Sequence, residues 1–319
     1  MRVPPEPFWP RRSPHFLACR RAVRSFDTSP ERPAVIGLSG GPDSLALVAA
    51  AAAEGKHVRA VVVDHDLQAG SAEVAARAEA QAERLGVPAA VVRVDVAGGN
   101  VEAAAREARY AALFAEAATI RTAAPTPPAQ VWVAHTADDQ AETLLLGALR
   151  GNPAGMGAKE GVGKQKLLVR PFLQVRRVDT VGACGELGLD YWRDPMNEDP
   201  AYRRVAVRRE IIPALSELLG GDAVPALAAT AARIADDRAL VESLADTGPT
   251  DDCAELAAAP AALRRRRIAA WLVAEGVAVQ GGQLAAIEAL AADWHGQGPV
   301  HVAGGTVARV GGRLIFRAR

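Results

Sequence analysis

The sequence predicts an α/β fold in which a parallel, doubly wound sheet is followed by a second, smaller and mainly helical domain. In the first half of the chain, short runs of apolar and β-branched residues alternate with Ala-rich segments of helical pattern. Unbroken apolar runs are typical of strands buried on both faces, and strand–helix alternation is typical of parallel sheets. From about residue 216 to residue 294 the chain is rich in Ala and Leu without strand-like runs, which predicts helices.

The expected elements follow one another in a regular order. Four buried strands are predicted, at 34–38, 58–64, 89–95 and 130–134. The helices expected between them span 43–54, 71–85 and 101–119. The glycine-rich stretch 151–164 predicts a mobile loop, and a basic helix is expected from Gln174. Residues 299–317 alternate in polarity and contain two Gly-Gly pairs, which predicts a small terminal β element.

We divide the chain into three parts, because 319 residues suffice for two domains with sizeable cores. A basic N-terminal segment leads into the α/β domain, and a mainly helical domain with the terminal β element follows. Their bounds are 1–30, 31–215 and 216–319.

The composition indicates a cytoplasmic protein that does not enter a membrane. No run of about 18 apolar residues is present, and the N-terminus lacks the apolar stretch of a signal peptide. Cys19, Cys184 and Cys253 are far apart and form no CxxC pair, so neither a disulfide framework nor a structural zinc site is indicated. Such cysteine usage suits a reducing compartment.

The net charge of zero conceals a polarised chain. Residues 159–177 carry six basic residues against Glu160, and residues 203–210 carry four arginines against Glu210. The stretch 222–255 instead has eight acidic residues against two arginines. We therefore expect a phosphate-binding face, and binding to nucleic acid that weakens steeply with salt.

A glycine-rich loop follows the first predicted strand. Residues 33–44 read PAVIGLSGGPDS, so a buried strand leads into the loop and a helix follows it. Glycines let backbone N–H groups approach a ligand, and a helix N-terminus adds partial positive charge, so the arrangement suits a phosphate group. The spacing matches neither GxGxxG nor the Walker loop. The alternative interpretation is a turn with Ser or Asp as helix N-cap.

This loop resembles the SGGxDS signature of the PP-loop ATP pyrophosphatases. The resemblance implies cleavage of ATP between its α and β phosphates, with adenylation of an acceptor. The nucleotide-binding residues that it implies are Ser39, Gly40, Gly41, Pro42, Asp43 and Ser44. Asp43 would also contribute to the handling of magnesium and pyrophosphate.

Two further blocks carry polar residues toward the same edge of the sheet. His65, in VVVDHDL, lies at the carboxyl end of the second strand, where ligands of open parallel sheets bind, although it could equally be a solvated loop histidine. In NVEAAAREARY, Glu102, Arg106 and Arg109 share one helix face with Tyr110 beside it. That face is either a salt-bridged solvent face or a polar wall of the pocket, with arginine contacting phosphate.

The block AHTADDQAET follows the fourth strand directly. His135, Asp139 and Glu142 are spaced i, i+4, i+7 and would face the cleft of the glycine loop. Two carboxylates and an imidazole at this edge suit a magnesium site or a general base. Helix capping would explain Asp138 but not His135.

Together these blocks resemble the tRNA(Ile)-lysidine synthetases, one branch of the PP-loop family. The segments GNPAGMG, RPFLQVRR and WRDPMNEDPAYRR also resemble this family in their order, so the likeness covers about residues 15–215. The chain resembles the short form, with one C-terminal domain. Asp66 and Gln68 stand where the family often has glycine and arginine, and Val205 where many members have asparagine.

The resemblance implies an enzyme that uses ATP, Mg²⁺ and free L-lysine on an isoleucine tRNA with a CAU anticodon. ATP adenylates the C2 oxygen of the wobble cytidine and releases pyrophosphate. The lysine ε-amine then attacks C2 and expels AMP, so that the resulting lysidine reads AUA instead of AUG. A homodimer and a tRNA-binding C-terminal domain are also expected from the resemblance alone.

Site roles are assigned from the resemblance and the chemistry of the side chains. The catalytic residues are Asp43, His135, Asp139 and Glu142, and the metal ligands are Asp43 and Asp139. His65 joins the glycine loop as a nucleotide-binding residue. The substrate-binding residues are Glu102, Arg106, Tyr110, Arg204 and Arg208. Either Asp139 or Glu142 could accept the proton of the ε-amine, and the sequence leaves this open.

Three other functions are compatible with a PP-loop fold: a tRNA thiolase, a small-molecule amidating synthetase and a non-catalytic RNA scaffold. The cysteines lie outside every motif, which disfavours the thiolase, and the basic segments exceed the needs of a small-molecule enzyme. In the C-terminal part, Arg264 to Arg267 could contact tRNA or form a salt-bridged surface. Trp271 and Trp294 are expected in the core.

Overall fold

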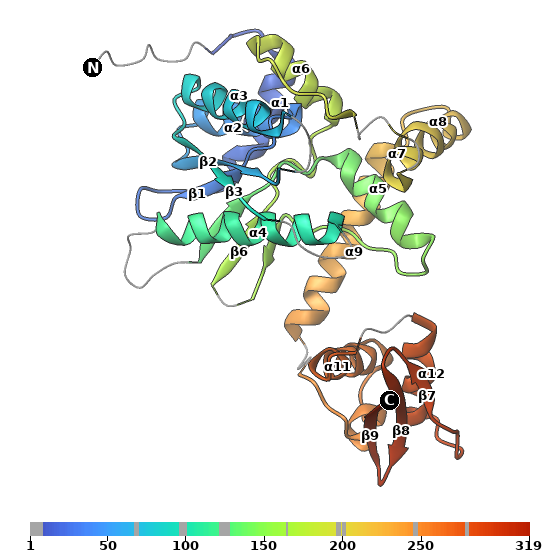
Figure 1. Cartoon of the computed structure of the whole chain (residues 1–319). Helices are drawn as coiled ribbons and strands as arrows, with labels where there is room; N and C mark the ends of the chain where they lie inside the picture. Colours follow the sequence, from blue (N-terminus) through green and yellow to red (C-terminus); the bar gives the residue numbers. More distant parts are fainter. Residues whose placement is uncertain are drawn as a thin grey trace. The chain divides into compact units, whose positions relative to one another are not determined.

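The computed structural model describes residues 9–66, 70–95, 101–120, 128–163, 165–195, 199, 202–244, 248–277 and 281–319. The chain folds into two compact units (Figure 1). Unit 1 comprises Met1–Leu146 and Pro153–Arg233, and unit 2 comprises Gly147–Asn152 and Ile234–Arg319. Each unit has its own hydrophobic core.

The sheet of unit 1 has the strand order β3-β2-β1-β4-β6-β5. Its strands are β1 (Ala34–Gly37), β2 (Val58–Asp64), β3 (Ala89–Arg93), β4 (Ala129–Trp132), β5 (Lys159–Gly161) and β6 (Lys166–Val169). Neighbouring strands are parallel except for the antiparallel pair β5–β6. The predicted parallel sheet is confirmed. The prediction of a loop over 151–164 was wrong in part, because β5 lies within it.

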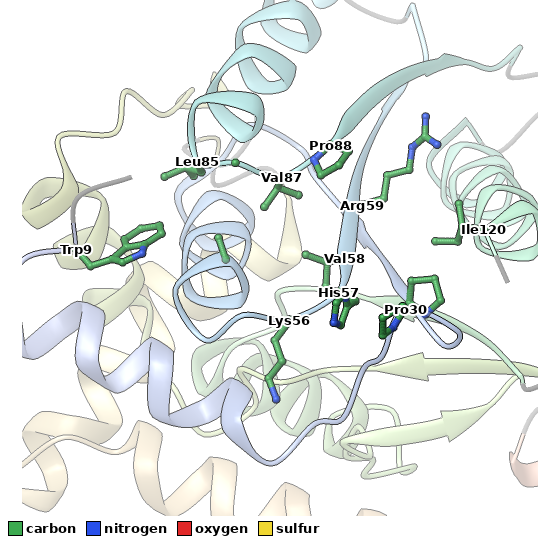
Figure 2. Close-up of a pocket in the computed structure, with 13 residues that line it drawn as sticks. Trp9, Pro30, Lys56, His57, Val58, Arg59, Leu85, Val87, Pro88 and Ile120 are labelled. Carbon is green, nitrogen blue, oxygen red and sulfur yellow. The ribbon is translucent and has the colours of Figure 1, made fainter. Parts of the chain in front are cut away.

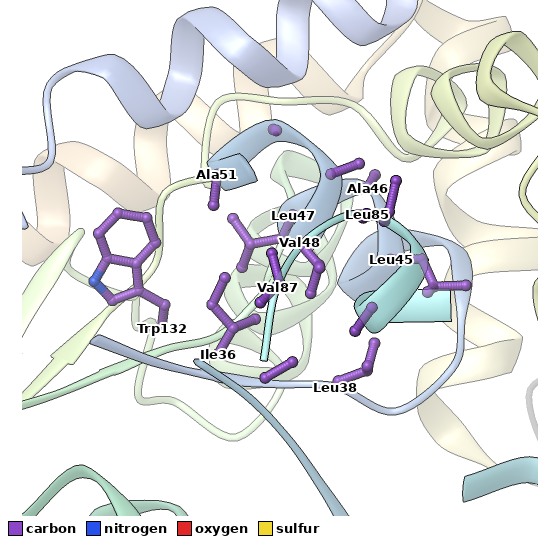
Figure 3. Close-up of a cluster of buried hydrophobic side chains, with 14 of the residues drawn as sticks. Ile36, Leu38, Leu45, Ala46, Leu47, Val48, Ala51, Leu85, Val87 and Trp132 are labelled. Carbon is purple, nitrogen blue, oxygen red and sulfur yellow. The ribbon is translucent and has the colours of Figure 1, made fainter. Parts of the chain in front are cut away.

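Side chains of the central strands alternate between two helical layers, so the sheet is doubly wound. Ile36 packs in the cluster of α2 (Pro42–Ala53) and α3 (Ser71–Arg84). Its neighbour Val35 packs on the other face, with Leu113 of α4 (Val101–Thr119). Figure 3 shows Ile36 and Trp132 of the sheet beside Leu47 of α2. The predicted helices 43–54, 71–85 and 101–119 agree with these bounds to within one residue.

The N-terminal segment is part of unit 1. Helix α1 (Pro14–Arg24) packs against α2 and against α6 (Arg177–Leu187). Glu186 of α6 accepts hydrogen bonds from the backbone N–H groups of His15 and Phe16, at 3.3 and 2.8 Å. A residue far away in the sequence thus caps the N-terminus of α1. His15 Nδ1 lies 2.8 Å from an Asp179 carboxylate oxygen. These contacts fix α6, whose N-terminus enters the site.

The boundary between the two units lies within a long helix, α9 (Val224–Leu244), and not near residue 216 as the sequence predicts. Helix α5 (Ala137–Ala148) packs with α7 (Arg203–Ala206), the π-helical turn η2 (Val207–Ile211), α8 (Ile212–Leu219) and the first half of α9. Because Val207, Ile212, Val224 and Ala228 share one cluster with Ala137, unit 1 extends to Arg233.

Unit 2 is helical with a small terminal sheet, in agreement with the pattern of the sequence. Its helices are α10 (Cys253–Ala258), α11 (Ala261–Ala274) and α12 (Gly281–Ala292), besides the end of α9. Three antiparallel strands follow: β7 (Val300–Val302), β8 (Gly305–Val310) and β9 (Arg313–Ala318). The core joins Leu272, Ile287, Val307 and Leu314.

Within the described part of the chain, no single helix is both long enough and apolar enough to cross a membrane. Only Arg203–Leu219 and Val224–Ser243 taken together pass the length and composition criteria, and they are bent by 105°.

Candidate functional site

The glycine loop lies at the carboxyl end of β1 and leads into α2. Gly40 has a φ of 79°, and a Cβ there would lie 3.3 Å from the Cβ of Ala78, so the loop requires glycine at this position. The Ser44 hydroxyl accepts a hydrogen bond from the N–H of Ser39 at 3.2 Å and donates to the carbonyl of Gly41 at 3.0 Å. These bonds fix the turn of the loop.

The first turn of α2 is open to an anion. Gly41 is the N-cap residue, and no side chain caps the helix. The alternative interpretation, in which Ser or Asp serves as the cap, is therefore wrong. Backbone N–H groups of the uncapped first turn and the positive end of the helix dipole meet at this loop, and this arrangement binds phosphate.

Asp139 is held in place on α5, which begins just after β4. Its Oδ2 accepts hydrogen bonds from the N–H and the hydroxyl of Thr136, both at 2.8 Å. Its Oδ1 accepts from Arg177 at 2.8 Å. Burial alone would raise the pKa of this carboxyl, but Arg177, His135 and the Thr136 donors outweigh burial and hold the pKa below its usual value. Asp139 is therefore a fixed carboxylate.

Glu142 is fully buried one turn further along α5. Its Oε1 accepts hydrogen bonds from Arg177 Nη1 at 3.0 Å and from Arg208 Nε at 2.7 Å. Arg204 Nε lies 3.8 Å from its Oε2. The predicted residues Arg204 and Arg208 thus adjoin the carboxylates, as direct partners of Glu142.

Asp43 reaches the same cluster from α2. Its carboxylate accepts a hydrogen bond from the Thr180 hydroxyl and lies 3.7 Å from Arg177 Nε. The pKa of Asp43 is raised to about 6, mainly by burial; the negative charges of Asp139 and Asp138 act in the same direction, while Arg177 and Thr180 act to lower it. Asp43 is therefore short of positive charge in its surroundings.

Arg177 and Thr180 are site residues that the sequence did not reveal. Arg177 was counted only as one charge in a basic segment, yet it pairs with Asp43, Asp139 and Glu142. Its partners lie far from it in the sequence, so no local spacing announces them. The basic tract in RPFLQVRR at the start of a helix was the only available signal.

His135 is neutral at ordinary pH. Its pKa is lowered to about 4, mainly by burial; the cations Arg170, Arg106 and Arg204 act in the same direction, and the charge of Asp139 opposes them. Arg170 Nε donates to His135 Nδ1 at 3.3 Å, which assigns the ring proton to Nε2. His135 can thus donate one hydrogen bond into the site without carrying charge.

The residues predicted on α4 are brought only partly into the site. The Arg106 guanidinium stacks on the Tyr110 ring at 5.0 Å, and its charge acts on His135. The side chain of Glu102 lies outside the described residues. No direct contact joins Arg106 or Tyr110 to the three carboxylates within the described residues.

The loop after β2 explains one departure from the family pattern. Asp66 has a φ of 51°, a left-handed conformation that glycine adopts freely and that aspartate tolerates better than most residues. Its N–H donates to an Asp64 carboxylate oxygen at 3.0 Å. Beside it, burial and Arg109 lower the pKa of His65, and its buried Nδ1 has no partner among the described residues. Gln68 lies outside them, and Val205 is buried on α7.

The donor set fits ATP and a magnesium ion, though no ready cage for a metal is present. Among the described residues, no group of three or more His, Cys, Asp or Glu side chains is arranged to hold a metal. Mg²⁺ commonly binds through one or two carboxylates and the substrate's phosphates. Asp43 and Asp139, which both contact Arg177, are the pair of carboxylates that could serve in this way.

A cavity in another part of unit 1 is lined by none of the predicted site residues. It measures about 760 Å³ and is lined by Lys56, His57 and Arg59, with Val58 and Pro88 at the amino ends of β2 and β3 (Figure 2). It is therefore at the edge of the sheet opposite to the glycine loop.

The three cysteines are free and buried. Cys184 lies beneath the glycine loop, with its Sγ 3.5 Å from the carbonyl of Pro42, and burial raises its pKa to about 12. Burial also raises the pKa of Cys19 and of Cys253. A catalytic thiol needs exposure and a lowered pKa, so these residues do not suit the chemistry of a thiolase.

The arginine run of unit 2 is mostly salt-bridged. Arg264 and Arg265 pair with Glu288, and Arg267 pairs with Glu255, so the second of the two interpretations describes this face. Trp271 is buried as predicted. The core prediction for Trp294 was wrong, because this side chain is 40% exposed and stacks under Arg309 at 5.6 Å.

Comparisons with known proteins show the family to which the chain belongs. One family model, a PP-loop domain, matches residues 17–215, and another, the TilS substrate binding domain, matches residues 252–315. The tRNA(Ile)-lysidine synthase of Corynebacterium diphtheriae is 52% identical over 308 residues, 96% of this chain and 98% of that protein. That of Corynebacterium glutamicum is 49% identical over 299 residues, 92% of this chain and 90% of its own.

Among solved structures, the fold is similar to the U34-tRNA thiolase NcsA from Methanococcus maripaludis with its 4Fe-4S cluster. The TM-score is 0.55 at 14% identity, over 75% of this chain and 81% of that one. At such low identity the likeness concerns the fold alone.

Proposed function

This chain belongs to the tRNA(Ile)-lysidine synthases, ATP-dependent ligases of the PP-loop family, and from that premise we propose which of its residues carry each step. The substrate tRNA is an isoleucine tRNA with a CAU anticodon. The C2 oxygen of its wobble cytidine attacks the α-phosphorus of ATP, and pyrophosphate leaves. The ε-amine of lysine then forms a bond to C2, and the C2 oxygen leaves with AMP.

One observation supports this assignment above the others: three carboxylates meet at the glycine loop. Asp43 comes from the helix after β1, and Asp139 and Glu142 come from the helix after β4. These strands are neighbours, and all three carboxylates contact Arg177. A phosphate-binding loop and fixed anions therefore adjoin each other, as a reaction between ATP and an amine requires.

In the adenylation step, backbone N–H groups of the loop and of the first turn of α2 bind the phosphates that leave. Asp43 and Asp139 would hold Mg²⁺, which offsets charge that develops on the phosphates. His135, neutral and with its proton on Nε2, is placed to donate a hydrogen bond to the nucleotide or the cytidine.

In the transfer step, the carboxylates of α5 bind the lysine substrate. Asp139 Oδ1 accepts a hydrogen bond from Arg177 alone among the described residues, so Asp139 is better placed than Glu142 to orient an incoming ammonium group and take its proton. Glu142 is fully buried between arginines and suits electrostatic support. Arg204, nearly half exposed, is placed to meet substrate phosphate.

The remaining assignments concern the molecule's partners. Unit 2 binds tRNA, supported by the substrate-binding family model over 252–315. Lysine as the amine and a homodimeric state follow from the family resemblance, and the exposed Leu218 and Leu219 of α8 suit a subunit contact. A cytoplasmic location agrees with three unpaired cysteines.

The test is incubation of the purified chain with MgATP, labelled lysine and bulk tRNA. We expect label to enter tRNA only when ATP is present, and only isoleucine tRNA with a CAU anticodon to be labelled. Incorporation of sulfur instead of lysine, or no incorporation into any tRNA, would contradict the proposal.

A further inference from the structure

Arg177 is the side chain on which the acidic groups of the site converge. Its Nη2 lies 2.8 Å from Asp139, its Nη1 lies 3.0 Å from Glu142, and its Nε lies 3.7 Å from Asp43. We propose that Arg177 is a positioning residue that sets the distance between Asp43 of the adenylation step and the α5 carboxylates of the transfer step. This role rests on the proposed function, because Asp43 is assigned there to the adenylation step and the α5 carboxylates to the transfer step.

The guanidinium group is suited to this task by its shape. Its nitrogens form a rigid planar fork, so one side chain can direct a separate N–H group at each of three carboxylates. A lysine ammonium in the same place is a single point charge and cannot keep three oxygens at fixed relative positions.

The backbone of α6 holds Arg177 in its place. The N–H of Arg177 donates to Asp138 of α5 at 2.8 Å. The Thr180 hydroxyl contacts both the Arg177 carbonyl, at 2.9 Å, and Asp43 of α2. The first turn of α6 is thus tied to both helices that supply the carboxylates, while α6 itself is held by α1.

The two α5 carboxylates that contact Arg177 also have other partners. Glu142 keeps Arg208 at 2.7 Å, and Asp139 keeps the two donors of Thr136, if Arg177 is removed. The main effect of losing Arg177 is therefore that the carboxylates are no longer held at fixed positions relative to one another. The loss of their hydrogen-bond partners is the smaller effect. Since misplacement by about 1 Å can cost about 100-fold in rate, the expected defect is in kcat.

Chemical rescue separates positioning from general stabilisation. Arg177→Ala would leave a gap lined by three carboxylates, into which free guanidinium fits. We expect kcat for lysine transfer to fall about 100-fold, with smaller changes in KM for ATP and lysine. Guanidinium chloride at about 20 mM, far below denaturing concentrations, should restore at least about tenfold of this loss and raise the melting temperature. Equal NaCl should do neither.

Arg176→Ala is the matched control, because Arg176 precedes Arg177 and pairs with Asp138 and Asp222 instead. It should keep kcat within about threefold and gain nothing from guanidinium. Arg177→Lys keeps one positive charge at the site, so it is the variant to measure if the alanine variant does not fold. It should also lose about 100-fold in kcat, without rescue, because its side chain fills the gap.

Two results would overturn the role of Arg177. One is a folded alanine or lysine variant with kcat near that of the wild type. The other is an alanine variant whose melting temperature rises with guanidinium while its kcat does not, since Arg177 would then only stabilise the fold. If the wild type itself incorporated no lysine, the proposed function would fail. The ATP–pyrophosphate exchange rates of the same variants would then decide whether Arg177 positions Asp43.

Discussion

At the scale of single residues, the sequence predicts which side chains lie near the site when those side chains are close together in the chain. It does not predict side chains whose partners are far away in the sequence. The i, i+4, i+7 spacing of His135, Asp139 and Glu142 predicted that they face one cleft; in the structure Asp139 and Glu142 lie on α5, and His135 lies in the loop between β4 and that helix. Arg177 joins two of them and Asp43 across separate segments, so only the fold brings it there. The roles of these residues in the reaction stay predictions.

Asp43→Ala should abolish the first step of the reaction. The carboxylate is needed at the glycine loop to hold a cation against the phosphates, so tRNA-dependent ATP–pyrophosphate exchange should fall by at least about 100-fold. Exchange is measured with labelled pyrophosphate. Asp237→Ala, on the exposed surface of α9, is the control and should exchange as the wild type does. Normal exchange in the Asp43 variant would contradict the assignment of the loop.

Gly40→Ala tests the backbone of the same loop. A left-handed φ costs an L-residue about 1–2 kcal/mol, and the new methyl group would press on Ala78. We expect ATP affinity, measured by calorimetry, to fall roughly tenfold, since 1.4 kcal/mol corresponds to that factor.

The control is Gly185→Ala in α6, where a Cβ meets no atom within 4 Å. Because alanine is the better helix former, this variant should be more stable than the wild type by up to about 1 kcal/mol, with unchanged ATP affinity. Equal effects of the two substitutions would argue against a special conformation at Gly40.

Among the elements, long apolar runs were predicted well and short ones were not. The strands β1 to β4 lie at the predicted positions. Strands β1 and β4 are buried almost throughout and β2 over most of its length, which leaves a strong apolar pattern, whereas β3 at the sheet edge is only partly buried. Strands β5 and β6 have three and four residues, and β5 is exposed along its whole length. Their pairing with β4 and with each other is a tertiary effect that a sequence pattern of this length does not carry.

The contact between α1 and α6 should make the stability of unit 1 depend on pH. The hydrogen bond that the His15 imidazole donates to the Asp179 carboxylate raises the pKa of His15 in the folded chain, and the charge of nearby Glu186 acts in the same direction. The stabilisation is therefore fully present below the unfolded pKa of about 6.5 and is lost as the pH rises through the raised folded pKa.

Urea unfolding of the wild type and of His15→Gln measures this effect. The wild type should exceed the variant in midpoint at pH 6 by more than at pH 8.5, because only the protonated imidazole gains from Asp179. A difference between the two proteins that stays constant over this range would show that the pair does not titrate on folding.

For the whole molecule, the neutral total charge hides internal pairing as well as polarity. Of the basic residues in 159–177, Arg170, Arg176 and Arg177 are paired with carboxylates of the chain. Arg204 and Arg208 likewise approach Glu142. The charge counted along these segments of the sequence therefore overstates the positive charge available to tRNA. The carboxylates that pair with these arginines lie in other segments and are not part of that count.

Binding of tRNA should nevertheless weaken with salt. The logarithm of the affinity is expected to fall linearly with the logarithm of the KCl concentration, since phosphate contacts release counter-ions. Arg203→Gln, at the exposed start of α7, should reduce the slope by about one. Filter binding from about 50 to 200 mM salt measures both, and binding that does not change over this range would contradict a phosphate-binding face.

The three-residue strand β5 has a consequence for the behaviour of the protein in concentrated solution. The outermost strand of an open sheet offers unpaired backbone groups to other molecules and can seed aggregation. Here that strand is short, runs antiparallel to its neighbour, and exposes Lys159 and Glu160. Charged side chains on so short an edge discourage a second sheet from joining it, so this segment also protects the chain against self-association through its sheet.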